Sequence, residues 1–181
     1  MNEDILVNTK RQLSGRRSRI AGNTFENIID TACCYYREKG MAIVEKTPEP
    51  MKPLYPYGDR RKGQYIACFD KKAQPDYKGV LCDGTAIIFE AKHTDSDRIR
   101  ENVVTETQRQ TFDDFYSMGA QCFVLVSMGF RSFYRVPWMV FKDMKSQFGR
   151  KYMKLEELNP YKLTEKQGIL LMLEGVKLNE N

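Results

Sequence analysis

The sequence predicts an α/β protein, because its segments show the periodicities of both helices and strands. Residues 25–39 repeat apolar side chains every three or four positions, as an amphipathic helix does. Residues 76–92 are two strand-like runs around Asp83-Gly84, a strong hairpin signal. Residues 121–127 (QCFVLVS) are almost wholly apolar, which is typical of a strand covered on both faces. A covered sheet flanked by helices follows.

The length of 181 residues fits one domain, since domains commonly have about 100 to 200 residues. With 41% hydrophobic and 29% charged residues, the composition is that of a globular protein rather than a disordered or membrane-embedded one. No apolar run approaches the roughly 18 residues of a membrane span, and the N-terminus lacks the apolar core of an export signal. We expect a cytoplasmic protein with no membrane partner.

The residue types restrict the chemistry. Five cysteines without a C-x-x-C pair indicate neither a disulfide framework nor a zinc site. The single histidine, His93, excludes histidine-rich metal clusters, and we expect it at the surface, at the end of a strand. There is no glycine-rich phosphate loop, so no organic cofactor is expected. Carboxylates and lysines must therefore carry any reaction, and the net charge of +5 permits a polyanionic partner.

The N-terminal residues 1–22 are basic and lack apolar periodicity, which predicts a flexible basic arm before a single domain of residues 23–181. Residues 23–26 (NTFE) predict a helix N-cap with Glu26 as its capping-box glutamate. Residues 41–46 are a short apolar run consistent with a strand. The arm residues that we expect to bind nucleic acid are Arg16, Arg17 and Arg19.

A proline-rich segment, residues 48–72, is too long for an ordinary connection and predicts a protruding insertion. Its basic residues alternate with aromatic ones, a mixture suited to sugar-phosphate contact and base stacking. The alternative is a solvated loop with its aromatic side chains packed at the base. The predicted DNA-binding residues of the insertion are Arg60, Arg61, Lys62, Lys71 and Lys72.

The second half of the chain continues the alternation of helices and strands. Apolar periodicity predicts a helix over residues 102–118, and residues 131–136 predict a strand. A proline then begins a helix over residues 138–148. A last helix is expected from Thr164 to about residue 177, with Gln167 completing a capping box.

The hairpin carries a PD…ExK pattern at Asp76, Glu90 and Lys92. Glu90 and Lys92 are two apart on one strand and so project from the same face. A three-residue turn over residues 82–84 would place Asp76 directly opposite Glu90. A two-residue turn would pair Asp76 with Ala91 instead and direct it to the other face. A site built from both carboxylates therefore depends on the type of turn.

Two carboxylates in such proximity repel each other and call for a cation between them. Mg²⁺ fits this requirement, with Mn²⁺ as its substitute, because it binds carboxylates, water and phosphate together. We expect in-line hydrolysis of a phosphodiester, with the metal on Asp76 and Glu90 and with Lys92 positioning the attacking water. The alternative for Glu90 is an ordinary ion pair with Lys92. Gln108 interrupts an apolar helix stripe, so it either meets a buried backbone group or serves as a metal ligand.

The ordered motifs resemble those of the PD-(D/E)xK restriction-endonuclease-like superfamily, and more closely those of the RecU family of Holliday junction resolvases. The resemblance covers about residues 16–137. It rests on Gly22 with Glu26 (G-x-x-x-E), the proline-rich segment, Asp76-Tyr77-Lys78-Gly79, Phe89-Glu90-Ala91-Lys92, Gln108 and Cys122-Phe123-Val124.

The resemblance implies a mixed central sheet flanked by helices, with the insertion as a stalk that engages the centre of a DNA junction. It also implies a Mg²⁺-dependent homodimer that nicks branched DNA symmetrically, with Glu26 as a further catalytic candidate. The family commonly has a threonine metal ligand two residues before the aspartate, where this chain has Gln74. The alternatives are a non-catalytic junction-binding recombination factor and another nuclease of the superfamily, for repair or restriction.

Overall fold

The computed structural model describes residues 3–69 and 74–176, and its centre is a five-stranded sheet in the order β1-β4-β5-β7-β8. Strands β5 and β7 are parallel, and the other neighbouring pairs are antiparallel. The predicted mixed central sheet is therefore confirmed. The strands are β1 Ala42–Lys46, β4 Tyr77–Leu81, β5 Ala86–Thr94, β7 Gln121–Met128 and β8 Ser132–Pro137.

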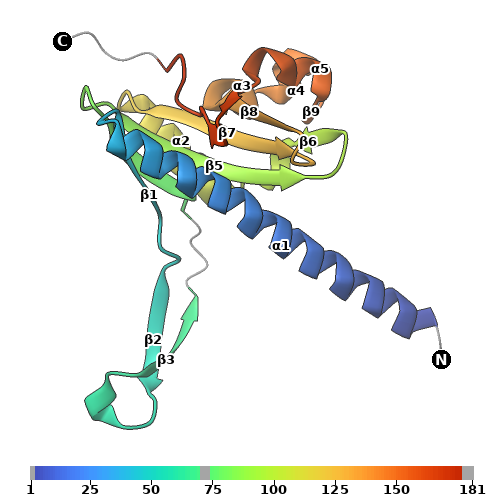
Figure 1. The fold of residues 1–181 in the computed structure, drawn as a ribbon. Coiled ribbons are helices and arrows are strands. Elements are labelled where there is room, and N and C mark those ends of the chain that lie inside the picture. The colour runs from blue at the N-terminus through green and yellow to red at the C-terminus, as the bar shows by residue number, and fades with distance from the viewer. Residues whose placement is uncertain (1–2, 70–73, 177–181) are drawn as a thin grey trace.

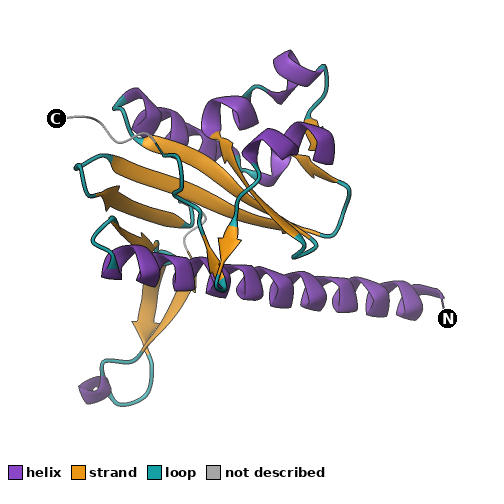
Figure 2. Ribbon diagram, turned by 45° about the horizontal axis from the view of Figure 1, so that its top comes forward, coloured by secondary structure: helices purple, strands orange, loops and turns teal. Residues whose placement is uncertain are grey.

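Helices cover both faces of this sheet (Figure 2). Helix α1 (Glu3–Glu38) packs on one face, and helix α2 (Glu106–Ser117) packs on the other with several shorter helices. Strand β7 supplies both cores, since Phe123 belongs to the cluster under α1 and Val124 to the cluster under α2. This alternation explains why the strand is apolar along its whole length.

Helix α1 is longer than the sequence predicted. It begins at Glu3, whereas an N-cap was expected near Asn23. The Thr24 hydroxyl instead donates a hydrogen bond to the Ile20 carbonyl, as within a continuous helix. Residues 3–22 contain no proline and many good helix formers, so the helix propagates N-terminally from its packed half. The side chains of the three arm arginines, Arg16, Arg17 and Arg19, lie outside the described part of the structure.

The proline-rich segment forms a hairpin that projects away from the central sheet (Figure 1). Strands β2 (Met51–Pro56) and β3 (Tyr65–Phe69) pair only with each other, and a short 3-10 helix, η1 (Arg60–Lys62), lies near their connection. The protruding insertion is thus confirmed. Its aromatic rings are not packed at a base, because each is 56% to 64% exposed: Tyr55, Tyr57, Tyr65 and Phe69.

The β4–β5 hairpin has the three-residue turn on which the site depends. The Leu81 N–H donates to the Thr85 carbonyl, and Gly84 has a left-handed φ of +86°. Tyr77 consequently pairs with Phe89. This register continues to Asp76 opposite Glu90.

The glycine of the D-Y-x-G motif allows β1 to approach β4. A Cβ at Gly79 would lie 2.1 Å from the carbonyl oxygen of Ile43 and 2.7 Å from the Cα of Val44. Because any side chain at position 79 would displace β1, sterics explain why the motif has a glycine there.

The C-terminal third contains the largest difference from the sequence-based expectation. The helix expected from Thr164 is instead a tight hairpin of β10 (Glu165–Lys166) and β11 (Ile169–Leu170). Gln167 and Gly168 both have positive φ, 53° and 78°, as a two-residue hairpin turn requires. That prediction was wrong because the local turn excluded the capping box.

The remaining elements are short and lie on the α2 side of the sheet. The predicted helix over residues 138–148 is split at Asp143. The predicted helix over residues 102–118 starts only at Glu106. No helix among the described residues is long and apolar enough to cross a membrane. The short elements are β6 Arg98–Arg100, η2 Glu101–Val103, α3 Trp138–Lys142, α4 Met144–Phe148, β9 Tyr152–Lys154, α5 Leu155–Leu158 and η3 Asn159–Tyr161.

Candidate active site

The edge of the sheet where β4 begins contains a pocket of about 430 Å³. The base of the β2–β3 hairpin, the end of β1 and the start of α2 all contribute to its wall. Six residues singled out from the sequence line it together, although they come from four separate parts of the chain: Glu26, Gln74, Asp76, Glu90, Lys92 and Gln108.

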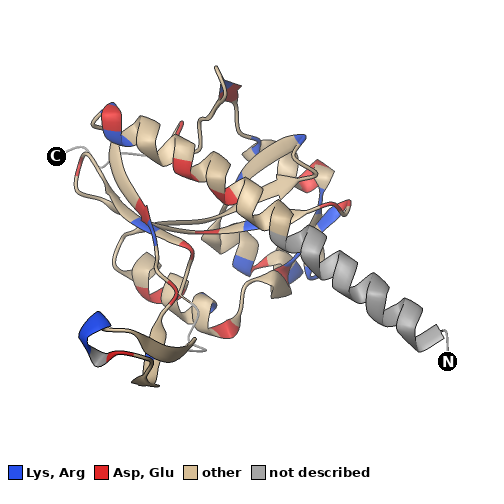
Figure 3. Cartoon of the chain, turned by 60° about the horizontal axis from the view of Figure 1, so that its bottom comes forward, with Lys and Arg blue, Asp and Glu red and all other residues tan. Residues whose placement is uncertain are grey.

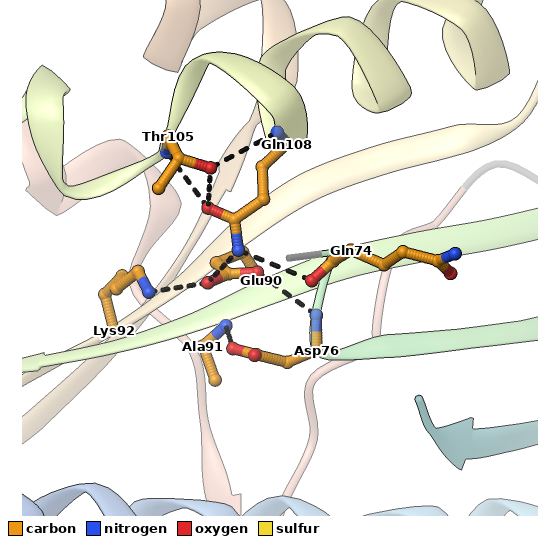
Figure 4. A network of polar contacts seen from close by, with 7 residues as sticks. All are labelled: Gln74, Asp76, Glu90, Ala91, Lys92, Thr105 and Gln108. Carbon is orange, nitrogen blue, oxygen red and sulfur yellow. Dashed lines mark hydrogen bonds and ion pairs between the residues drawn. The ribbon is translucent and has the colours of Figure 1, made fainter. Parts of the chain in front are cut away.

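The two carboxylates of the hairpin are each held by the backbone of the opposite strand (Figure 4). The N–H of Asp76 donates to Glu90 Oε2 at 3.1 Å. The N–H of Ala91 donates to Asp76 Oδ2 at 2.9 Å. Glu90 is 1% exposed, so its carboxylate depends on these partners for the hydrogen bonds that it loses from water.

The ammonium group of Lys92 lies 2.5 Å from Glu90 Oε1. Its side chain is 28% exposed and lines the pocket, whereas Glu90 is buried beneath it. The ion pair that the sequence left open is therefore present. The same ion pair places the Lys92 ammonium group beside the pocket, where the sequence predicted that this residue would position the attacking water.

Gln108 connects this pair to helix α2. Its Nε2 donates to Glu90 Oε1 at 2.8 Å, while its Oε1 accepts from the backbone N–H of Thr105 at 2.9 Å. Thr105 in turn accepts from the Gln108 N–H through its hydroxyl, which completes a capping box. The contact with a backbone group that the sequence left open for Gln108 is thus present at the Thr105 N–H, and its amide oxygen faces the helix start rather than the carboxylates. Sequence reasoning missed Thr105, although T-x-x-Q at a helix start is a recognisable signal.

Gln74 and Glu26 lie at the rim of the pocket and have other partners. The Gln74 side-chain oxygen accepts from Lys78 Nζ at 2.6 Å, and the Gln74 backbone carbonyl lies within 3.4 Å of Gln108 Nε2. Glu26 forms an ion pair with Lys46 at 2.7 Å and does not cap a helix.

Burial is the main electrostatic feature of the site. Burial, together with the neighbouring Asp76 charge, raises the pKa of Glu90 to about 7, although Lys92 acts to lower it. Burial also raises the pKa of Asp76, against the hydrogen bond from Ala91 that lowers it. Two adjacent carboxylates with raised pKa values are the arrangement that a divalent cation stabilises.

The donor set fits a hard divalent cation. Asp76 and Glu90 offer carboxylate oxygens, and the pocket-lining Thr47 has a buried hydroxyl without a hydrogen-bond partner among the described residues. Within residues 3–69 and 74–176 there is no group of three or more His, Cys, Asp or Glu side chains that could hold a metal. A cation here would therefore complete its shell with water and phosphate oxygens, as Mg²⁺ commonly does.

Other predicted residues lie away from the pocket. Arg61 and Lys62 are exposed at the tip of the projecting hairpin, where the cartoon of Figure 3 marks basic residues in blue. The Arg60 side chain and residues 70–73, which include Lys71 and Lys72, lie outside the described residues.

The surface position expected for His93 is wrong. Its side chain is 7% exposed and stacks on Phe130 with ring centroids 4.1 Å apart. Its ring nitrogens lie 3.0 Å from the Ser127 hydroxyl and 3.2 Å from an Asp95 carboxylate oxygen. Strand β5 runs two residues beyond Lys92 beside β7, so this end of the strand is covered.

The mixed sheet, with an aspartate gathered at the start of β4 beside a glutamate and a lysine on the neighbouring strand β5, is the arrangement of the restriction-endonuclease-like nucleases. Within that class, the family model for Recombination protein U (RecU) matches residues 20–178. The chain therefore belongs to the RecU family, as its motifs suggested.

Two relatives illustrate the degree of similarity. A protein of Bacillus pumilus (strain SAFR-032), named Holliday junction resolvase RecU, is 30% identical over 159 residues, which cover 84% of this chain and 77% of the relative. A protein of the same name from Streptococcus pneumoniae (strain Taiwan19F-14) is 31% identical over 108 residues, covering 58% of this chain and 54% of the relative. The solved structure of Hjc, a Holliday junction resolvase from Archaeoglobus fulgidus, has a TM-score of 0.45 at 12% identity over 77% of this chain and 93% of Hjc, a similarity too low to inform function.

The raised pKa of Glu90 predicts how stability depends on pH without metal. A carboxyl group with a pKa near 4.5 when unfolded and about 7 when folded favours the folded state at low pH. This contribution is full below about pH 4.5 and is lost as pH rises through about 7. Glu90→Gln should therefore stabilise the protein at pH 8 in EDTA, by about 1 to 3 kcal/mol, and much less at pH 5.

Thermal unfolding from pH 5 to pH 8 measures this difference. Glu165→Gln is the matched control, because Glu165 is exposed and should leave the pH dependence unchanged. An unchanged pH profile in Glu90→Gln would show that Glu90 titrates normally.

Proposed function

We propose that this protein is a divalent-metal-dependent endonuclease that resolves four-way DNA junctions, with Asp76, Glu90 and Lys92 as its catalytic residues. The observation that carries the proposal is the buried Glu90 carboxylate, bonded to the Asp76 backbone and to Lys92 at the wall of an open pocket. The family supports the substrate, because its relatives are named Holliday junction resolvases.

In the proposed mechanism, Asp76 and Glu90 would hold the divalent cation, which would supply Lewis-acid polarisation of the phosphate and make water a better nucleophile. The Lys92 ammonium donates hydrogen bonds toward the pocket, where it orients the attacking water or offsets charge on the phosphate. Gln108 holds Glu90 Oε1 in one orientation, and Thr105 fixes the amide of Gln108. The scheme is a single in-line hydrolysis without a covalent enzyme intermediate.

Two further residues complete the proposed pocket. Glu26 contributes a carboxylate beside Asp76 and is a candidate for a catalytic role, held by its ion pair with Lys46. For Gln74, the bond to Lys78 makes the side-chain oxygen less suited to a metal than the backbone carbonyl. The Thr47 hydroxyl is a further oxygen donor on the same wall.

The first prediction from the proposed function concerns cleavage. Asp76→Asn, Glu90→Gln and Lys92→Ala should each abolish the nicking of a labelled four-way junction in Mg²⁺ while leaving its binding largely intact, because binding rests on basic residues elsewhere. Wild-type protein should make paired symmetric nicks at the junction, none in a matched linear duplex, and none in EDTA. Asp114→Asn, an exposed acid on α2, is the control.

Three outcomes would contradict this scheme. Nicking by Glu90→Gln at the wild-type rate would show that Glu90 is not a catalytic residue. Equal cutting of duplex and junction would favour a repair or restriction nuclease. Binding of the junction without any cutting would favour a non-catalytic recombination factor.

A second prediction concerns assembly. A four-way junction has near two-fold symmetry, and two coordinated nicks require two sites, so we expect a homodimer with two-fold symmetry. Sedimentation at working concentration should give twice the monomer mass. A monomer that still makes paired nicks would contradict the prediction.

A third prediction concerns the projecting hairpin. Its exposed rings and basic tip are suited to the unstacked bases and converging backbones of a branch point. Replacing residues 58–64 with a short glycine-serine turn should lower affinity for the junction more than for duplex, and should leave the metal-dependent thermal shift unchanged. Filter binding on both substrates tests this; equal losses would make the hairpin a general basic patch.

A further inference from the structure

A second hollow adjoins the candidate active site on the α2 side. It is a groove of about 790 Å³ between the β6–β9 ribbon and the start of α2. Thr105 lines both the groove and the active-site pocket. The base of the projecting hairpin, at Pro48 to Pro50 and at Phe69, lines the active-site pocket but not the groove. The groove therefore continues from the pocket at Thr105 without including the hairpin base, and a strand in the pocket has access to it.

The lining of the groove is predominantly cationic. Four basic side chains, those of Arg98, Arg100, Arg109 and Lys151, line it with two acidic ones, those of Glu101 and Glu106. The least exposed pair is internally neutral, because Arg109 forms an ion pair with Glu101 at 3.0 Å and both side chains are under 20% exposed.

Two of the remaining cations have no ion pair. The side chains of Arg100 and Lys151 are exposed and have no salt bridge within the described residues. Arg98 pairs with Asp97, but both side chains are largely solvated, so this pair is easily exchanged for another anion. Ion pairs within the protein therefore leave Arg98, Arg100 and Lys151 able to bind a phosphate group.

The ribbon presents these groups in a fixed row. Arg98 and Arg100 are two apart on β6 and lie opposite Lys154 and Tyr152 of β9, so the four share one face. Tyr152 has two guanidinium groups near its ring, that of Arg98 at 5.2 Å and that of Arg150 at 4.8 Å. Ile99 and Met153 on the other face are fully buried, which anchors the ribbon to the core.

We propose that this groove binds the phosphodiester backbone of the DNA strand that flanks the scissile phosphate. The proposal rests on the proposed nuclease function, which supplies the polyanion and places it in the adjoining pocket. Arg100 and Lys151 neutralise phosphates, and Arg98 is held beside them by stacking on Tyr152. The contact reads backbone rather than sequence, so it serves duplex arms and junctions alike.

The test compares a double variant, Arg100→Ala with Lys151→Ala, with wild-type protein and a charge-matched control, Lys39→Ala with Lys166→Ala. The control lysines are exposed, at the end of α1 and on β10, and they line neither hollow. Binding to junction and to linear duplex is measured in EDTA over a series of salt concentrations. The groove variant should bind both substrates at least about tenfold more weakly at 0.1 M salt, and its log–log salt slope should fall by about two units. The control should keep the wild-type slope.

Further measurements separate the possible outcomes. Arg100→Lys with Lys151→Arg conserves charge and should restore the slope, while thermal unfolding confirms that each variant is folded. If the alanine variant keeps the wild-type salt slope while wild-type protein still nicks junctions, the groove does not bind DNA and the proposed nuclease function stands. Failure of wild-type protein to bind or cut DNA would overturn the nuclease function itself. Methylphosphonate substitution close to the nick should weaken wild-type binding but not that of the groove variant.

Discussion

The burial of one carboxylate, Glu90, is the constraint on which the rest of the structure depends. A carboxylate that is 1% exposed in a sheet remains charged only if its oxygens receive hydrogen bonds. Here three donors supply them: the Asp76 backbone, the Lys92 ammonium and the Gln108 amide. These donors come from the opposite strand, the same strand and a helix, so the site forms only when all three elements are in register.

Backbone features set that register. The left-handed Gly84 closes a three-residue turn, and this turn places Asp76 rather than its neighbour opposite Glu90. Gly79 lets β1 approach β4, which brings the end of β1 and its Lys46 to the pocket. On the other side, the capping box of Thr105 begins helix α2, and Gln108 in the first turn of this helix reaches the carboxylate. Local turn chemistry thus determines a long-range constellation.

Much of this was predictable from the sequence, because the decisive signals are local and periodic. The alternation in residues 76–92 and the Asp83-Gly84 turn predicted the hairpin but left two registers open, of which the structure has the one with a three-residue turn. The apolar run of residues 121–127 predicted the doubly covered strand. The failures were of two kinds. Helix α1 extends to Glu3 because propensity continued a helix whose packed half was recognised. At Gln167 a single left-handed residue before a glycine produced a hairpin where the side-chain pattern indicated a helix. The contact of Gln108 with Glu90 depends on tertiary packing. From the sequence, Gln108 could only be assigned either to a buried backbone group or to a metal.

The energetics separate a functional site from a structural ion pair. If the Glu90–Lys92 pair served stability alone, a second carboxylate beside it would be a liability, because the charge of Asp76 raises the pKa of Glu90. An amide or apolar residue at position 76 would relieve the repulsion, and the backbone bond to Glu90 would survive, since the Asp76 N–H donates it. The acid at this position is therefore costly in the folded protein, which is the pattern expected of the metal-binding role that we propose for it. The cost is greatest above about pH 7, where Glu90 is ionised and a divalent cation has the most charge to bind.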